Sequence, residues 1–518
     1  MTRPTFLGFE SGRKGLAVAQ KGLDITGQNL MNINTPGYTR QRVDQVSVSA
    51  YGHNSRYGGT KVDFAGQGVD ITGIYQTRNA FLDRRFREEY SDTSYYSQKV
   101  DILADISAVI DEMAETGGGL MGAVNTITTA LQGLTADKST DRSYANIFRT
   151  AVQGMVQTLH EYDNKLTKVA NQQKFDLTLA VDEVNRKLNE LAGLNKKIVE
   201  EIGVDTSEKG IYGPNELLDA RNLLLDELAE YGNIYVTKEN DGSVTVTMGD
   251  HEVLRGDECE KLQMLEYSDG TVTLSWNSTA EDVKFTSGTF KASLEMINGR
   301  GPNVQSPRDS SEKGVLYYRD RLDTFARTLA NVMNNTLPMT LNDQGEPSSI
   351  QYRQLLGAMV QDDSGKTSVI TQPGHVTAAN ITVSDEWMDS VDYCLPSPSS
   401  ATNAQYFTKL NTKLTSDGTT EFYTNGQCFT GSFRDYVTDV YDTCVGEESY
   451  YKGRYEAAAA ITDSLLDQRD DMSAVSKDEE TTNMMTYQRY FQAVSRMMTT
   501  MDEALDVIIN KMGLVGRS

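Results

Sequence analysis

Near its C-terminal end the chain repeats an apolar residue at alternating steps of three and four. This pattern continues for four heptads and places one apolar seam along one face of a helix, which is the arrangement that pairs helices in coiled coils. A single helix with such a seam is only marginally stable in water, so it needs a partner. The seam consists of Met484, Tyr487, Phe491, Val494, Met498, Met501, Leu505, Ile508 and Met512.

The N-terminal end carries a shorter seam of the same kind, with small residues such as Gly12 and Ala19 between its apolar positions. Those positions are seven residues apart: Phe9, Leu16, Leu23 and Leu30. The seam stops at residues 32–38, Asn-Ile-Asn-Thr-Pro-Gly-Tyr, where proline and glycine break the helix. The two ends are therefore predicted to meet in a coiled stalk, which suits the subunit of a polymer better than an active site.

Length and hydropathy favour an elongated, multi-domain chain. At 518 residues it is too long for one core, so three or four domains are expected. Hydrophobic residues make up 38% and the mean hydropathy is −0.47, as in elongated helical proteins whose seams bury less than a layered core. No apolar run reaches the ~18 residues of a membrane-spanning helix, and the start does not resemble a secretory signal.

The net charge of −24 is unevenly placed. Residues 1–35 hold four basic and two acidic side chains, and residues 479–518 hold four basic and five acidic ones, so the ends sum to +1 and the middle carries −25. Nearly neutral ends can pack against copies of themselves while an acidic body stays soluble. The balance argues against nucleic acid as a partner, because phosphate binding needs a basic face.

The middle of the chain alternates between helical and β-strand periodicity. Short strands are predicted over 40–75, where Val43, Val46, Val62 and Phe64 are among the alternating apolar residues, and the turn signals Asp241-Gly242 and Asp269-Gly270 punctuate a β-rich segment over 231–290. Residues 340–434, rich in Ser, Thr, Asn and Gly, are predicted to be irregular. The predicted helices cover 78–113, 141–202 (about 90 Å if unbroken), 215–230, 316–337 and 434–475.

The predicted fold class is mainly α with inserted β-rich domains, elongated, with the terminal helices paired as a coiled coil. Four parts are expected. They are a terminal coiled-coil domain (1–36 with 474–518), a helical rod domain (37–230 with 312–342 and 435–473), a β-rich domain (231–311) and an outer irregular or β-rich insertion (343–434).

The sequence offers no positive case for an enzyme. Its four histidines lie far apart, no two cysteines have metal-ligand or Cys-x-x-Cys spacing, and no phosphate loop or nucleophile elbow is present. We therefore expect no catalytic residue, no metal and no cofactor. Free thiols are favoured for all four cysteines, and a Cys428–Cys444 bridge is the one pairing to test.

Two local signatures resemble those of bacterial flagellar axial proteins, the rod, hook and hook-associated proteins. One runs Asn-Leu-Met-Asn-Ile-Asn-Thr-Pro-Gly-Tyr-Thr-Arg-Gln over 29–41, and the other combines Glu-Glu-Thr-Thr-Asn-Met over 479–484 with Tyr487-Gln488 and Phe491-Gln492-Ala493. The stretch Glu-Leu-Leu-Asp-Ala-Arg-Asn-Leu-Leu-Leu-Asp-Glu-Leu over 216–228, followed by the Asp-Gly hairpin, is similar to the hook–filament junction members, the hook-associated protein 1 family. Its motif residues here are Asn32, Asn34, Thr35, Pro36, Gly37 and Tyr38.

The resemblance implies a structural, non-enzymatic subunit outside the cell, exported unfolded through the flagellar type III apparatus without a cleavable signal. It implies self-association in a ring or short helical layer through the two seams. The implied partners are the hook protein, the second hook-associated junction protein, an export chaperone and the export apparatus, with no nucleic acid and no membrane insertion. The alternatives are another axial protein (hook protein or second junction protein), or an axial scaffold whose residues 343–434 carry an enzymatic or adhesive domain.

Overall fold

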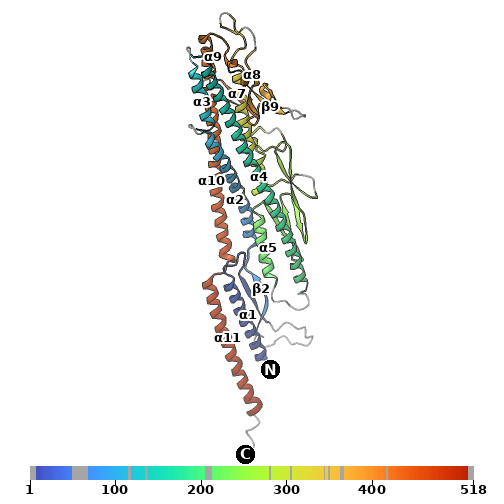
Figure 1. Ribbon diagram of the computed structural model, residues 1–518. Helices are drawn as coiled ribbons and strands as arrows, with labels where there is room; N and C mark the ends of the chain where they lie inside the picture. Colours follow the sequence, from blue (N-terminus) through green and yellow to red (C-terminus); the bar gives the residue numbers. More distant parts are fainter. Residues whose placement is uncertain are drawn as a thin grey trace, which may run out of the picture. The chain divides into compact units, whose positions relative to one another are not determined.

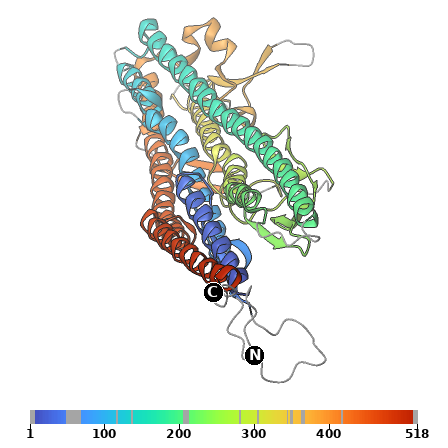
Figure 2. The same cartoon turned by 90° about the horizontal axis from the view of Figure 1, so that it is seen from below.

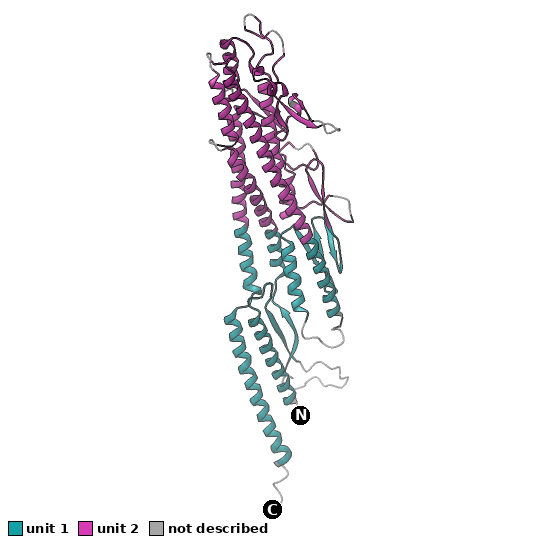
Figure 3. Cartoon of the chain, viewed as in Figure 1, with its two compact units in different colours: residues 1–90, 184–261, 459–518 teal, residues 91–183, 262–458 magenta. Residues whose placement is uncertain are grey.

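The structure is a computed structural model in which the chain divides into two compact units (Figure 3). Unit 1 comprises residues 1–90, 184–261 and 459–518, and unit 2 comprises residues 91–183 and 262–458. The structure describes residues 7–48, 68–114, 118–134, 138–204, 213–278, 282–303, 306–342, 345–347, 351–361, 367–415 and 418–511. Val62, Phe64 and Met512 lie outside them. Three helices contribute residues to both units: α2 (Ala80–Ala114), α4 (Arg142–Val204) and α10 (Phe433–Ser473).

Unit 1 contains the two ends of the chain, and α1 lies beside α11 in both views (Figures 1 and 2). The helices wholly within it are α1 (Leu7–Met31), α5 (Asn215–Leu228), α11 (Lys477–Asp506) and the π-helical η3 (Val507–Lys511). The strands β1 (Gln41–Ser47) and β2 (Val69–Gln76) pair antiparallel, with a register shift between Asp44 and Gln45. A four-stranded antiparallel sheet follows in the order β3 (Ile234–Lys238), β4 (Val244–Met248), β5 (His251–Arg255) and β6 (Glu258–Cys259).

Unit 2 is a helical body with small antiparallel sheets. Its own helices are α3 (Gly119–Gly133), α6 (Thr289–Ile297), α7 (Val315–Asn334), α8 (Asp385–Asp389) and α9 (Ser400–Thr415), with the 3-10 turns η1 (Pro373–His375) and η2 (Val391–Cys394). Its sheets are β7 (Leu262–Glu266) with β8 (Val272–Trp276), β10 (Thr367–Ile370) with β9 (Leu356–Gln361) and β11 (Ile381–Val383), and β12 (Glu421–Thr424) with β13 (Gln427–Thr430).

The long helices predicted from apolar periodicity are confirmed. The 141–202 prediction corresponds to the 63-residue α4, and the predictions at 78–113, 215–230, 316–337 and 434–475 correspond to α2, α5, α7 and α10. Outside residues 340–434, the predicted helices do not include α3 or α6. The helix α3 begins at Gly119, directly after Gly118, where glycines favour a break, and α6 is only 9 residues long, too short for a periodic signal.

The prediction that residues 340–434 are irregular is wrong, whereas the alternative of a β-rich insertion agrees with the strands found there. This segment contains three small helical elements, α9 and five strands, and its apolar side chains belong to the same buried cluster as those of α7 and α10. Trp387, Phe407 and Phe422 are among the most deeply buried side chains of the chain. Ser, Thr and Asn are frequent here because they hydrogen-bond the short turns between these elements, so composition alone concealed the core.

A fully buried lysine ties several elements of unit 2 together. The Lys99 ammonium in α2 forms ion pairs with Glu295 of α6 (2.8 Å) and with Glu312 (3.0 Å). It also lies 4.7 Å from the ring centroid of Tyr95 and 4.6 Å from that of Tyr451 in α10. Two carboxylates and two aromatic rings thus replace the water that an ammonium loses on burial.

We expect Asp323 to make unit 2 less stable as pH rises. Burial raises the pKa of this α7 carboxyl from 3.8 to about 6, although the Ala378 amide donates a hydrogen bond to it at 2.7 Å. Between these two values the folded state holds a proton that the unfolded state has lost, so the free energy of unfolding falls across this window. Asp323→Asn keeps an acceptor for Ala378 and should gain about 1–3 kcal/mol above about pH 7, with little change near pH 4.

Urea unfolding of wild type and Asp323→Asn at both pH values measures this difference. The comparison isolates one group, because all other titrating side chains are shared. A stability difference that is the same at both pH values would contradict the assignment.

Candidate assembly interface

The close contact between α1 and α11 uses a line of small residues on α1. Gly8, Gly12, Gly15, Ala19 and Gly22 recur at alternating steps of four and three and are all buried, which is the spacing of a coiled-coil contact line. A helix with glycine along one face lets its partner's side chains reach the backbone. The α11 residues opposite these glycines are Met501, Met498, Val494 and Tyr487.

The contact is tight enough that glycine is required at several of these positions. A β-carbon built on Gly22 would lie 2.5 Å from Cε1 of Tyr487, and one on Gly12 would lie 2.8 Å from Cγ of Met498. Real β-carbons do not approach other heavy atoms this closely. By contrast, a β-carbon on Gly27 of the same helix meets nothing within 4 Å. The fit therefore depends on the position of the glycine in the contact line.

The apolar N-terminal seam residues lie one position beyond this contact line. Phe9, Leu16 and Leu23 each follow a glycine of the line, Leu30 follows Asn29, and all four are partly exposed. One step along a helix turns a side chain by about 100°. These four residues therefore flank the α11 contact, and it is the small residues noted between them that face α11.

The C-terminal seam residues lie at graded depth. Val494 is 9% exposed, Phe491 is 37% exposed and Ile508, in η3, is 48% exposed. Burial, together with the nearby Glu480 carboxylate, raises the pKa of Tyr487. Five seam residues are partly exposed: Met484, Tyr487, Met498, Met501 and Leu505. The seam thus faces α1 along its centre, and Phe491 and Ile508 form its edges.

The motif residues of 32–38 form a hydrogen-bonded turn at the end of α1. Thr35 donates its hydroxyl hydrogen bond to Oδ1 of Asn32 at 3.1 Å, and the Tyr38 hydroxyl donates to Oδ1 of Asn29 at 2.8 Å. Gly37 has a φ of +76°, which favours glycine. Asn34 and Pro36 are exposed at the surface of the turn. The turn thereby directs the chain from α1 into β1.

Four residues that the site prediction did not include join this turn to α11. Arg40 Nε lies 2.7 Å from the carboxylate of Glu480, whose side chain is 1% exposed, and Arg40 Nη1 lies 2.7 Å from Glu479. Asn29 donates to Glu480 at 3.2 Å and to the Gln41 carbonyl at 2.9 Å. The opposite charges of Arg40 and Glu480 in two terminal motifs were a signal that could have suggested the pair.

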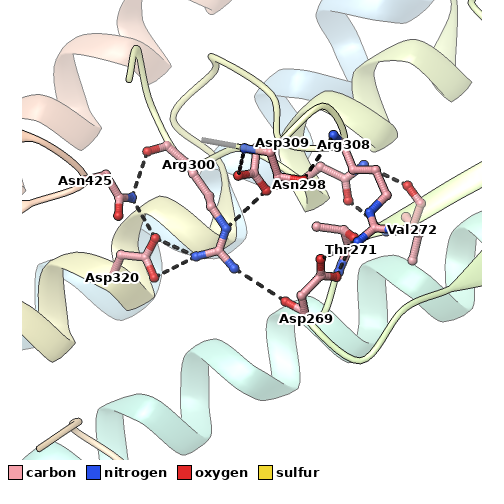
Figure 4. A network of polar contacts seen from close by, with 10 residues as sticks. Asp269, Thr271, Val272, Asn298, Arg300, Arg308, Asp309, Asp320 and Asn425 are labelled. Atoms are coloured by element: carbon pink, nitrogen blue, oxygen red, sulfur yellow. Dashed lines mark hydrogen bonds and ion pairs between the residues drawn. The ribbon is translucent and has the colours of Figure 1, made fainter. Parts of the chain in front are cut away.

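A separate polar network in unit 2 fixes its turns (Figure 4). The Arg300 guanidinium forms two hydrogen bonds to Asp320, at 2.7 and 2.9 Å, and lies 3.3 Å from Asp309. Asn425, at the turn between β12 and β13, donates to Asp320 at 2.7 Å. Hydrogen bonds from the Thr271 hydroxyl and amide and the nearby Arg308 lower the pKa of Asp269 to about 2. Each of these charged side chains forms at least one ion pair or hydrogen bond with a protein partner, which is the pattern of a structural network.

Within the described residues, no group of three or more His, Cys, Asp or Glu side chains is arranged to hold a metal ion. All four cysteines are free thiols, so the structure does not contain the Cys428–Cys444 bridge. No helix in the described part of the chain has the length and apolar character needed to cross a membrane.

Comparison with known proteins shows what this chain is similar to. The model of the flagellar hook-associated protein FlgK helical domain matches residues 106–348, and that of the flagellar basal body rod FlgEFG protein C-terminal region matches residues 468–511. Flagellar hook-associated protein 1 of Bacillus subtilis is 28% identical over 535 residues, spanning 99% of each chain. The chain is thus similar to hook-associated protein 1 over nearly its whole length.

Other proteins similar to this chain are more distant. The Escherichia coli protein is 23% identical over 331 residues, which span 62% of this chain and 54% of that protein. The solved structure of the flagellar hook junction protein FlgK from Burkholderia pseudomallei aligns with a TM-score of 0.52 and 12% identity, covering 76% of this chain and 100% of that one. The likeness of the structures supports the mainly helical fold with small sheets.

Proposed function

We infer that this chain is a structural subunit of the bacterial flagellum at the junction between hook and filament. The observation that carries the inference is the pairing of α1 with α11 in a chain that aligns over its whole length with a hook-associated protein 1. A contact line of glycines against bulky side chains produces a stiff helix pair, as a load-bearing joint requires. The role is structural, and we assign no catalytic step.

The exposed edges of the helix pair are the proposed contacts between copies. Exposed apolar side chains flank the seam on α11 and η3, among them Tyr490, Met497 and Ile509. Soluble monomers rarely expose contiguous apolar patches, and such patches mark interaction surfaces. We propose that these edges, with Phe491 and Ile508 on α11 and η3 and the flanking seam of α1, pack against neighbouring copies in a ring or short helical layer.

The proposed position between hook and filament also suggests which other flagellar proteins contact this chain. A layer between hook and filament has two faces, so the hook protein contacts one and the second hook-associated junction protein contacts the other. We propose that the chain reaches this place outside the cell by export in an unfolded state through the flagellar type III apparatus, guided by a chaperone. We retain the four-part division 1–36 with 474–518, 37–230 with 312–342 and 435–473, 231–311, and 343–434 as a proposal.

The double variant Phe491→Asp with Ile508→Asp tests the assembly surface. Both side chains are substantially exposed in the single chain, so the monomer should fold normally. Between copies the two carboxylates would be buried without partners, at a cost of several kcal/mol. In a strain lacking the gene, the wild-type copy should restore filaments, whereas the variant should be exported and leave bare hooks in electron micrographs.

A matched control is Gln492→Asp with Thr500→Asp. These positions are exposed on the side of α11 away from the seam and add the same charge. The control should restore full-length filaments. Full-length filaments with the Phe491/Ile508 variant would exclude this surface, and full-length filaments in the strain without the gene would exclude the junction role itself.

A further inference from the structure

Unit 1 contains a cavity of about 550 Å³ that the junction role does not use. It is lined by the segment joining β2 to α2, the first turns of α2, one face of α5, and strands β3 and β4. Two tyrosines that line it, Tyr75 and Tyr235, are about half exposed. Tyrosine with arginine around a hollow is a composition that proteins use for binding.

The charge of the cavity lining is opposite to that of the chain. Five basic side chains line it against one acidic one, Asp83, although the whole chain has a net charge of −24. Most of these cations already have a carboxylate partner, because Arg78 pairs with Asp83 at 2.7 Å and Arg87 pairs with Asp226 at 2.7 Å. Asp226 is shared with Arg469 at 2.6 Å, so the buried carboxylates do not balance the buried guanidinium groups.

Arg221 of α5 is a buried cation that forms no ion pair with a carboxylate of the described residues. Its side chain is 4% exposed, and its Nη1 donates to the carbonyl of Gly242 at 2.7 Å, which is a neutral partner. Within the described part of the chain, Nε of Arg221 and Nη2 of Arg87 have no hydrogen-bond acceptor. Burial and the neighbouring Arg87 lower the pKa of Arg221 to about 10, consistent with a guanidinium that lacks an anion.

We propose that this cavity binds an oxyanion, held by the free N–H groups of Arg221 and Arg87 and flanked by Tyr75 and Tyr235. A guanidinium group binds carboxylate, sulfate or phosphate oxygens through charge-assisted hydrogen bonds. The oxyanion is either a free inorganic ion or a carboxylate side chain of another polypeptide. The site stands apart from the helix pair and is independent of the proposed junction role.

Calorimetric titration of the full-length protein tests the site, with sodium sulfate as the inorganic probe and N-acetyl-glutamate amide as the side-chain probe. Sodium chloride holds the ionic strength constant, because screening alone changes the stability of a charged protein. We expect saturable binding of at least one probe, and at least a tenfold weaker affinity in Arg221→Gln. Arg255→Gln, on the exposed side of β5, should bind like wild type.

A second variant keeps the test decisive if Arg221→Gln does not fold. Leu218 of α5 lines the same cavity and is partly exposed, so Leu218→Glu places a carboxylate beside the arginines without removing them. This variant should melt at a higher temperature than wild type and should bind neither probe. Binding of sulfate alone identifies an inorganic ion, and binding of the glutamate derivative identifies a side-chain carboxylate. Absence of binding by wild type, or equal binding by wild type and Leu218→Glu, overturns the proposal.

Discussion

Gly22→Leu is expected to separate α1 from α11 and to leave cells with hooks but no filaments. Even the β-carbon of the new side chain would lie 2.5 Å from the Tyr487 ring, and three further carbon atoms would follow it. Such overpacking costs about 1–3 kcal/mol where neighbours can shift and more where two backbones hold the site. The helix pair has little other core to compensate. Loss of protection of both helices in amide exchange, together with bare hooks, would be the observed result.

Gly27→Leu provides the matched control. It lies on the same helix, introduces the same side chain and gains the same helix propensity, but nothing lies within 4 Å of its β-carbon. It should assemble like wild type and be slightly more stable. Normal filaments with Gly22→Leu would mean that the close α1–α11 contact is not needed for assembly.

The second large effect is expected at the Arg40–Glu480 pair. Arg40→Met removes the guanidinium from a carboxylate that is 1% exposed, which leaves a buried charge with Asn29 as its side-chain donor within the described residues. Removing one partner of a buried pair typically costs about 3–5 kcal/mol. We expect unit 1 to unfold at a correspondingly lower urea concentration. Amide exchange at β1 and α11, which does not depend on tryptophan fluorescence, measures this unfolding.

The double variant Arg40→Met with Glu480→Met distinguishes the energy of the ion pair from the cost of leaving one charge buried without its partner. Two apolar side chains in place of two charges should recover much of the lost stability, because neither charge is then left unpaired. The coupling energy of this cycle measures the pair itself. If the single and double variants lose the same stability, the carboxylate is already well solvated in the folded protein.

The sequence predicted the long helices because their apolar period persists. In α4, the buried residues Leu159, Leu166 and Leu188 continue one helical period over many turns. A period of that length is recognisable even where single positions depart from it. The ends of the chain were assigned correctly to paired helices for the same reason. The face of α1 that contacts α11 was not predicted correctly. A hydrophobic pattern favours Leu16 over Gly15 as the contact residue, whereas the close approach of the two helices requires a small residue such as Gly15.

The segment 340–434 was misjudged because its elements are short. The Asn425-Gly426 pair has φ values of +46° and +80° and closes the β12–β13 hairpin, which is the turn that Asn-Gly favours. That signal stands in the sequence between Phe422 and Phe429. The buried Lys99 and Arg221 could not be foreseen in this way, because a charged residue looks solvent-exposed until its distant neighbours are known.

The glycine line also makes the two terminal helices unlike partners. Along their contact, α1 supplies hollows and α11 supplies the methionine, valine and tyrosine side chains that fill them. Two copies of α11 would set bulky side chains against each other, and two copies of α1 would bury little more than backbone. Self-pairing of either helix is therefore disfavoured, and each N-terminal helix is matched to a C-terminal one. In the proposed ring or helical layer, this difference would favour contacts of an N-terminal helix with a C-terminal helix over contacts between like helices.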